Sequence, residues 1–433
     1  MSTLAVLILV LILALLVGLP IFMALGISTC VALLVTDVPL SMIPMTLFRG
    51  VDQFPLLAIP CFILAGSLME SCGVTRQIID VVRQPAGVIH GGLGVATILA
   101  CMFFSAISGS GPGTVAAVGS LMIPSMIRAG YDRAYAGAVA SSGGTLGILI
   151  PPSNPMIIYG VIASVSITGM FLAGMIPGLM IGLAHCFVAW IVAKRLRFIE
   201  TPEPFRLGEF LRTCWRSKWA LASPVVILGG IYAGVFTPVE ASIVAVFWAL
   251  FVGGAVNRQL TIGKLYRALQ DGAMISGTVL VIVGTSTLFG QLLTFEQAPT
   301  RMANFILGIS EHWFVVLLLL IAVFYVLGMF METLSTIIIL TPVLLPVVTR
   351  LGIDPIHFGI IFVVTNEVAF LTPPLGVNLF VASKMAVMYF WTSKNFIAAL
   401  TRCGLSWPSM TPCCRALKTS VQAMGIGSTP QAL

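Results

Sequence analysis

The chain has 433 residues, of which 58% are hydrophobic and only 9% are charged, whereas a soluble globular protein carries roughly a quarter charged residues. This composition excludes an ordinary soluble domain and predicts a polytopic membrane protein. The formal net charge of +7 is explained by Lys and Arg in cytoplasmic loops. We expect no nucleic-acid partner, because the sequence has no nucleic-acid module and no basic face with interleaved aromatic residues.

The first apolar stretches set the pattern of the N-terminal part. A membrane helix needs roughly 20 mostly apolar residues, so the first stretch, residues 4–35, is too long for one straight span. Pro20 is expected to kink or split it. The next predicted spans are residues 54–69 and 93–104, joined by an amphipathic connector at residues 76–83.

Glycine and proline are concentrated between residues 105 and 159, inside apolar sequence. The chain reads ISGSGPGTVAAVGS from Ile107 and GGTLGILIPPSNP from Gly143. Such breaks survive in hydrocarbon only where they are buried in protein or line a wet cavity. We therefore expect a re-entrant helical hairpin around residues 109–126, a polar turn at 128–133 and a helix that unwinds near 143–154.

An apolar segment at residues 171–192 then leads into the most basic loop of the chain, residues 194–218. The positive-inside rule places this loop in the cytoplasm. The next predicted spans, 219–236 and 242–256, return the chain to a second basic cluster on the same side. Further spans are expected at residues 275–293 and 313–331.

The glycine- and proline-rich stretch has a second copy. A shift of 222 places without gaps pairs Thr114 with Thr336, Pro124 with Pro346, Arg128 with Arg350, Gly130 with Gly352, Asp132 with Asp354, Gly137 with Gly359, Pro151 with Pro373 and Pro152 with Pro374. Chance matching of apolar sequence would not select Gly, Pro and charged residues, so both copies are expected to share one local fold. Paired interrupted segments in two halves indicate the binding site of a secondary transporter.

Small hydroxyl residues and glycines gather around both breaks. Unwound carbonyls with Ser and Thr hydroxyls can hold sodium, and half-helix N-termini can face anionic substrate groups. The alternative is that these small residues only permit close helix packing. The candidates in the first copy are Ser105, Ser108, Ser110, Thr114, Ser141, Ser142 and Thr145 around Gly109, Gly111, Gly143, Gly144, Gly147 and the Pro151 break.

The second copy adds two carboxyl groups, Glu332 and Glu367, in apolar surroundings. A carboxylate within the membrane is by default a functional-site hypothesis, although Glu332 could also lie at the end of a helix near the interface. The remaining candidates are Gly328, Thr333, Ser335, Thr336, Thr341, Thr365, Asn366, Thr372, Pro373 and Asn378.

Other polar residues have simpler explanations. Asp132 and Asp354, beside Arg128 and Arg350, suit helix caps or charge pairs, and Glu240 suits a helix start. An intramembrane hydrolase with Ser110 as nucleophile and His185 downstream is a remote alternative, because no orienting acid is evident and a single-site enzyme needs no second copy. We therefore expect that the protein is not an enzyme and that it uses no cofactor other than sodium as the coupling ion.

Long motifs in this sequence resemble the large membrane subunit of the tripartite ATP-independent periplasmic (TRAP) transporters. They are LLAIPCFILAGSLMESCG (56–73), ISGSGPGTVAAVGSLMIP, IPPSNPMIIYG, GVFTPVEAS (234–242), GMFMETLSTIIILTPVLLPV, LGIDPIHFGII and LTPPLGVNLFVAS. The resemblance implies an all-α elevator-type secondary transporter of a bacterial inner membrane, driven by sodium. It also implies a small membrane subunit, a periplasmic binding protein and a carboxylate substrate, such as a dicarboxylate or a sialic acid.

The resemblance also implies where sodium binds. Sodium would lie near Ser105, Ser108, Gly144 and Gly147 in the first copy and near Gly328, Thr365 and Thr372 in the second. The full set of substrate- or ion-binding candidates adds Pro151, Glu332, Pro373 and Asn378. The chain departs from the family at Thr365 and Ala369, where the family often has Asn and Gly.

These observations predict a division of the chain into four parts. Residues 1–193 form the first repeat half with its hairpin at about 105–160, and 194–218 form the cytoplasmic linker. Residues 219–383 form the second half with its hairpin at about 328–383. The tail, 384–433, lacks an apolar run of spanning length and resembles a replaced C-terminus, so we expect it to be poorly ordered and to impair transport. The main alternative function is a two-hairpin dicarboxylate or anion transporter that works without a binding protein.

Overall fold

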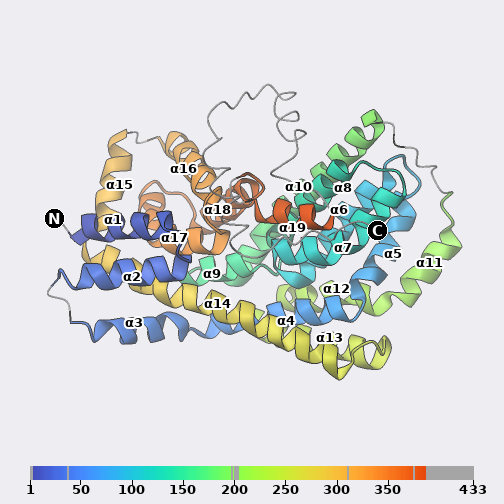
Figure 1. Cartoon of the computed structure of the whole chain (residues 1–433), viewed down its shortest axis with the longest axis horizontal. Coiled ribbons are helices and arrows are strands. Elements are labelled where there is room, and N and C mark those ends of the chain that lie inside the picture. Colours follow the sequence, from blue (N-terminus) through green and yellow to red (C-terminus); the bar gives the residue numbers. More distant parts are fainter. Residues whose placement is uncertain are drawn as a thin grey trace, which may run out of the picture. The chain divides into compact units, whose positions relative to one another are not determined.

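The computed structural model describes residues 3–36, 39–196, 198, 204–309, 312–373 and 376–386. Within these ranges every regular element is a helix (Figure 1). The predicted tail lies outside the described residues from position 387 onward.

The first half begins with the split that Pro20 predicts, because Pro20 is the residue that precedes α2. The helices α1 and α2 pack against each other (Figure 1). The elements of this half are α1 (Thr3–Leu16), α2 (Ile21–Leu33), α3 (Met42–Val51), η1 (Phe54–Leu57), α4 (Ala58–Ser71), α5 (Val74–Ala86), α6 (Gly92–Ser108), α7 (Gly111–Arg128), α8 (Arg133–Leu149), α9 (Asn154–Ile162) and α10 (Ile167–Leu196).

The linker and the second half together contain two helices that the sequence did not predict, α15 and, inside the basic linker, α11. Three apolar side chains of α11, Leu207, Leu211 and Trp215, recur every fourth residue and are exposed. The elements of the linker and the second half are α11 (Leu207–Arg216), α12 (Lys218–Tyr232), α13 (Pro238–Phe251), η2 (Val252–Val256), α14 (Ile262–Phe295), α15 (Ala298–Ile309), α16 (Trp313–Gly328), α17 (Thr333–Arg350), α18 (Pro355–Ala369) and α19 (Val377–Met385).

Both copies of the repeat have the same local structure. Adding 222 to the bounds of α7 gives those of α17, and adding 222 to the first residue of α8 gives that of α18. The left-handed glycines Gly130 and Gly352 occupy equivalent turns. Asp132 accepts hydrogen bonds from the amides of the second and third residues that follow it, and Asp354 does the same in the second copy. The predicted cap role of these two carboxylates is confirmed.

The first hairpin differs from its predicted extent. Its turn is at Gly109 and Ser110, so the first arm is α6, which the sequence assigned to a separate span, and residues 109–126 cover only the second arm. The helix α8 continues through Gly143 to Leu149, and only residues 150–153 are unwound. A buried helix tolerates glycine at a cost of about 1 kcal/mol, and packing against α6 and α7 offsets that cost.

The two copies interlock. The helices α6, α7 and α8 pack together, and α19 of the second copy packs against α7 and α8 of the first. The long helix α14 runs past α2, α3 and α4 and also contacts α17 (Figure 1). The site described below is therefore enclosed by elements from both halves.

In the part of the chain that the structure describes, six helical segments are long and apolar enough to cross a membrane. They are Phe54–Ser71, Arg133–Ile162, Ile167–Leu196, Pro238–Val256, Ile262–Phe295 and Thr333–Arg350. Shorter apolar helices accompany them, including α1, α2, α6 and α16. The structure thus supports the predicted class of an all-helical polytopic membrane protein.

Candidate functional site

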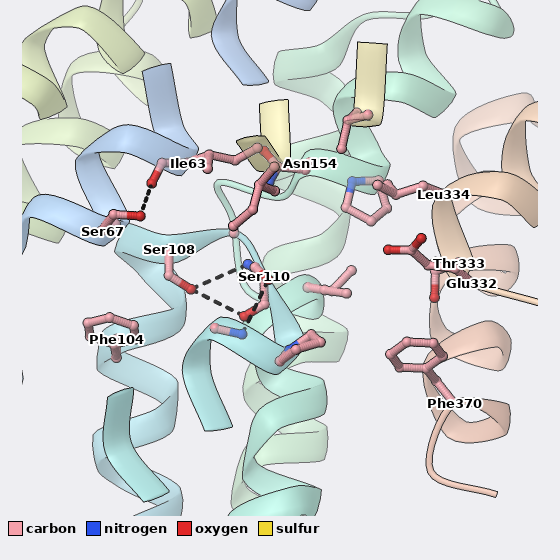
Figure 2. A pocket seen from close by; sticks show the side chains of 18 of the residues that line it. Ile63, Ser67, Phe104, Ser108, Ser110, Asn154, Glu332, Thr333, Leu334 and Phe370 are labelled. Atoms are coloured by element: carbon pink, nitrogen blue, oxygen red, sulfur yellow. Dashed lines mark hydrogen bonds between the residues drawn. The ribbon is translucent and has the colours of Figure 1, made fainter. Parts of the chain in front are cut away.

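A cavity of about 150 Å³ lies between the two copies of the repeat. Figure 2 shows Ser108, Ser110 and Asn154 of the first copy across from Glu332 and Thr333 of the second. The helices α4 and α14 supply the rest of the wall. The lining residues are Ile63, Gly66, Ser67, Glu70, Phe104, Ser108, Gly109, Ser110, Pro112, Gly113, Ile148, Asn154, Pro155, Ile275, Val279, Glu332, Thr333, Leu334 and Phe370.

Three helix N-termini end at this cavity, those of α7, α9 and α17. Each N-terminus carries a partial positive charge from the aligned peptide dipoles, roughly half an elementary charge. Ser110 caps α7 and Ser153 caps α9 through their hydroxyl groups. The lining as described has two carboxylates, Glu70 and Glu332, and no Lys, Arg or His. The backbone, rather than a cationic side chain, therefore provides the attraction for an anion.

Ser108 is the centre of a hydroxyl network at the turn of the first hairpin. Its hydroxyl lies 3.0 Å from the Thr114 hydroxyl, donates to the Ser110 carbonyl at 3.3 Å and accepts from the Ser110 amide at 3.3 Å (Figure 2). Ser105 is also fully buried, but its hydroxyl donates to the Cys101 carbonyl at 2.5 Å within α6. Ser105 can therefore offer an ion its backbone more readily than its side chain.

Gly144 and Gly147 allow α8 to approach this turn closely. A Cβ atom at Gly147 would overlap the Ser110 carbonyl oxygen and lie 2.6 Å from the Thr114 hydroxyl oxygen. A Cβ atom at Gly144 would overlap Val115. Both glycines are buried, and Pro151 lies in the unwound segment directly after α8. The structure thus gathers Ser108, Gly144 and Gly147 within one small region.

Asn378 connects the second copy to this region. It lies on α19 and is fully buried. A Cβ atom at Gly111 would lie 3.3 Å from both polar atoms of its amide, and one at Gly144 would lie 3.4 Å from its Cγ atom. Neither polar atom has a hydrogen-bond partner among the described residues. Asn378 is thus an unsatisfied polar group at the predicted ion region of the first copy.

The second copy groups its candidates differently from the sequence prediction. Gly328 faces Asn366, whose Oδ1 would lie 2.8 Å from a Cβ atom there. Asn366 is fully buried and its Oδ1 has no partner among the described residues, whereas Thr365 is only partly buried. The Thr372 hydroxyl lies 3.1 Å from the Tyr325 hydroxyl, and Pro373 follows it in the turn.

Glu332 and Glu367 have different surroundings. Glu332 precedes α17 and lines the cavity (Figure 2). Glu367 is fully buried behind the wall, where its Oε1 accepts a hydrogen bond of 2.9 Å from Thr333. Because Thr333 lines the cavity, this bond couples the start of α17 to α18.

Sequence reasoning missed Asn154 and Glu70 as cavity residues. Asn154 Oδ1 is buried without a partner among the described residues, and Asn154 starts α9 immediately after the predicted break. The position of Asn154 in PPSNP was a signal that the sequence could have used. Glu70 follows a long apolar run, so nothing in the sequence distinguished it from an interfacial residue.

The arrangement does not favour the hydrolase alternative. The Ser110 hydroxyl accepts a hydrogen bond from the Gly113 amide as a helix cap. His185 lies on α10, and no hydrogen bond joins it to Ser110 among the described residues. The same residues contain no group of three or more His, Cys, Asp or Glu side chains that could hold a metal ion. Carbonyl, hydroxyl, amide and carboxylate oxygens are the possible ligands that this site offers to a cation.

Comparison with known proteins gives consistent matches over most of the chain. The profile of the family described as "Tripartite ATP-independent periplasmic transporter, DctM component" matches residues 8–415. This match extends beyond position 384, where the sequence alone placed the start of an atypical tail.

Three of the similar proteins are named for different transported compounds. The chain is 42% identical over 373 residues to the isethionate TRAP transporter permease protein DctMQ of Oleidesulfovibrio alaskensis, covering 86% of this chain and 59% of that protein. It is 41% identical to the C4-dicarboxylate large permease protein DctM of Pseudomonas aeruginosa, covering 83% of each. It is 36% identical to the sialic acid large permease protein SiaM of Vibrio cholerae, covering 81% of this chain and 82% of that one.

A solved structure shares the fold. It is described as the crystal structure of the Alcanivorax borkumensis YdaH transporter, which reveals an unusual topology, and it covers 90% of each chain with a TM-score of 0.62. At 16% sequence identity, this likeness concerns the fold alone.

Proposed function

Because the chain belongs to the DctM family of tripartite ATP-independent periplasmic transporters, we propose that it is the substrate-translocating subunit of a sodium-coupled importer of a small carboxylate. Members of this family are inner-membrane proteins, and the apolar helices of the chain agree with that location. The chain spans 59% of the length of the isethionate relative and 83% of the P. aeruginosa relative.

The main support is the convergence of three helix N-termini from both copies on one cavity. A site of this kind binds carboxylate, sulfonate or phosphate groups through backbone amides and dipoles. Its volume of about 150 Å³ suits a small part of an organic acid more readily than a large ligand. The names of the relatives, which include isethionate, C4-dicarboxylate and sialic acid, belong to the same class of organic anions.

The chemistry of the walls supports sodium coupling. An anion beside Glu70 and Glu332 adds negative charge to a cavity whose described lining has no cationic side chain. Sodium ions held by carbonyl and hydroxyl oxygens compensate that charge. We assign the first ion to the region of Ser108, Gly144 and Gly147, and the second to the region of Gly328 and Asn366. Ser105, Pro151, Thr365, Thr372 and Pro373 stay candidates at the edges of these regions.

The proposal includes two protein partners and a mode of movement. A periplasmic binding protein delivers the anion, and a small membrane subunit completes the scaffold. The two hairpins move together with the cavity past α4 and α14, in the manner of an elevator. Gly66 on α4 lies close to Ser108 on α6, since a Cβ atom at Gly66 would lie 3.2 Å from Ser108 Cα. The lack of a side chain at Gly66 supports sliding of the moving part past α4.

Uptake into proteoliposomes tests this function. The full chain, its small subunit and its binding protein are reconstituted together, and uptake of radiolabelled succinate, N-acetylneuraminate and isethionate is followed. We expect uptake of one anion with an inward sodium gradient and none with an equal potassium gradient. Uptake that persists without the binding protein would favour the alternative two-hairpin transporter. Uptake of none of these anions, in a sample that binds sodium, would contradict the proposed substrate class.

A further inference from the structure

A second, larger cavity adjoins the first. Its volume is about 870 Å³, and Glu70 lines both cavities. We call this second cavity the vestibule. It is bounded by the end of α4, by α5, by α7 and by α11.

Three arginines face the vestibule and have no ion-pair partner in the described part of the chain. Arg76 and Arg83 lie on one face of α5, and Arg216 lies at the end of α11. Within the described residues the one ion pair joins Arg206 to Glu209 at 3.5 Å, so neither Glu70 nor Asp80 pairs with any of the three. Thr75 adds a buried hydroxyl without a hydrogen-bond partner in the same part of the structure. The vestibule therefore offers unused donors for an anion.

The charge pattern places the vestibule on the cytoplasmic side. The helix α11 lies within the basic segment 194–218, which the positive-inside rule assigns to the cytoplasm. The segment after η2, which contributes Gln259, belongs to the second basic cluster on the same side. An anion that leaves the inner cavity toward the cytoplasm passes Glu70 and enters the vestibule.

We propose that Arg76, Arg83 and Arg216 form a second, weaker anion site on the release side, which receives the transported carboxylate after it passes Glu70. The identity of this anion as transported cargo rests on the proposed function, whereas the binding site itself does not. A guanidinium group matches the planar carboxylate or sulfonate with two parallel hydrogen bonds. Because the three side chains are exposed, water and salt screen them, and binding is weak and reversible.

Glu70 has a defined part in this arrangement. Its carboxylate lies at the junction of two regions that each attract an anion, the helix N-termini on one side and the arginines on the other. A negative charge at that point raises the free energy of an anion in the passage. The inner cavity and the vestibule are therefore two separate anion-binding sites rather than one continuous site.

Arginine footprinting tests the vestibule independently of transport. The full chain in sodium-free buffer is treated with phenylglyoxal, and modification of each arginine is followed by peptide mass spectrometry with and without potassium succinate or potassium isethionate. We expect the anion to slow modification of Arg76, Arg83 and Arg216, about twofold at a concentration equal to its dissociation constant. Arg212 is the matched control, because it lies on α11, is exposed and does not line the vestibule.

Two outcomes would overturn the proposal. Equal slowing at Arg212 would mean that the anions act only through ionic strength. Protection of the three arginines by phosphatidylglycerol nanodiscs, but not by succinate or isethionate in phosphatidylcholine nanodiscs, would assign the vestibule to lipid head groups. If the footprint appears and reconstituted uptake fails, the anion site stands and the transport proposal falls.

A second readout links the site to release. Efflux of the transported anion from preloaded proteoliposomes is compared for Arg216→Gln and Arg212→Gln. We expect slower efflux for Arg216→Gln alone, with unchanged sodium-dependent stabilisation in both variants. Equal efflux of the two variants would contradict a role of the vestibule in release.

Discussion

At the scale of single residues, the absence of a side chain is as important as the presence of one. Gly144 and Gly147 bring α8 into contact with the turn of the first hairpin, where a Cβ atom would meet Val115, Thr114 and the Ser110 carbonyl. Protein interiors at this density do not accommodate an added methyl group without movement. The ion region proposed for the first copy therefore depends on these glycines.

Gly147→Ala tests this dependence. We expect it to lower the free energy of unfolding by about 1–3 kcal/mol, since overpacking forces backbone shifts, and to weaken sodium-dependent stabilisation in thermal denaturation. Gly277→Ala on α14 is the matched control, because nothing lies within 4 Å of an added Cβ atom there. In an exposed helix this control is neutral or stabilising by about 1 kcal/mol. Equal behaviour of both variants would refute the close-approach argument.

Asn366 and Thr365 provide a second residue-scale comparison. Asn366 faces Gly328, and its Oδ1 has no partner among the described residues, so Asn366→Ala should reduce sodium-dependent stabilisation. Thr365→Ala should have little effect, because Thr365 is only partly buried. The two variants are compared by sodium titration of the melting temperature. A larger loss of sodium-dependent stabilisation in Thr365→Ala than in Asn366→Ala would instead support Thr365 as the sodium ligand, as the sequence resemblance implied.

The same pair shows what the sequence could and could not predict. Composition and the repeat drew attention to the polar residues around position 366, and the structure shows Asn366 buried beside Gly328. Which of two neighbours on α18 faces Gly328 depends on the rotation of α18 against α16, and that rotation is set by packing of side chains from distant parts of the chain. Glu70 was not predicted as a cavity residue for a related reason, since it lines the cavity only because α4 packs beside the first hairpin.

At the scale of elements, the repeat was the most informative feature of the sequence. An ungapped shift of 222 predicted one local fold for both copies, and the bounds of α7 and α17 agree with it at both ends. The arm α6 was taken for a separate span because its residues are almost all apolar. Periodicity cannot distinguish a buried hairpin arm from a membrane span, because both are apolar on all sides.

The helix caps make the equivalence of the two copies measurable. Asp132→Ala and Asp354→Ala should each lower the free energy of unfolding by about 1 kcal/mol, because each removes the acceptor for two backbone amides. Asp→Asn at either position should cost much less, since Asn also caps helices. Chemical denaturation of the four variants provides the measurement. A loss at one position but not at the other would contradict the structural equivalence of α8 and α18.

At the scale of the whole molecule, residues of both copies line the cavity, and the anion binding that we propose for it depends on both copies. The first copy supplies the N-termini of α7 and α9, and the second supplies that of α17. Neither copy alone encloses the cavity. The ion site that the sequence predicted in each copy stays a prediction, and elements of both copies also line one shared cavity.

This shared cavity predicts coupling between ion and anion. If sodium compensates the charge of the anion, each ligand raises the affinity of the other by the same factor, because binding free energies are reciprocally linked. Calorimetric titration of sodium with and without succinate, and of succinate with and without sodium, measures both factors. Affinities that do not change would show that the ion and the anion bind independently.

The most direct test of a sodium-dependent site between the two copies is thermal stabilisation of the purified chain by sodium, with potassium as the control. A ligand that binds only the folded state raises stability as its concentration exceeds the dissociation constant. We predict a sodium-specific rise in melting temperature that is weakened by Ser108→Ala in the first copy and by Asn366→Ala in the second. Equal stabilisation by sodium and potassium, or a sodium effect that neither substitution changes, would contradict the account.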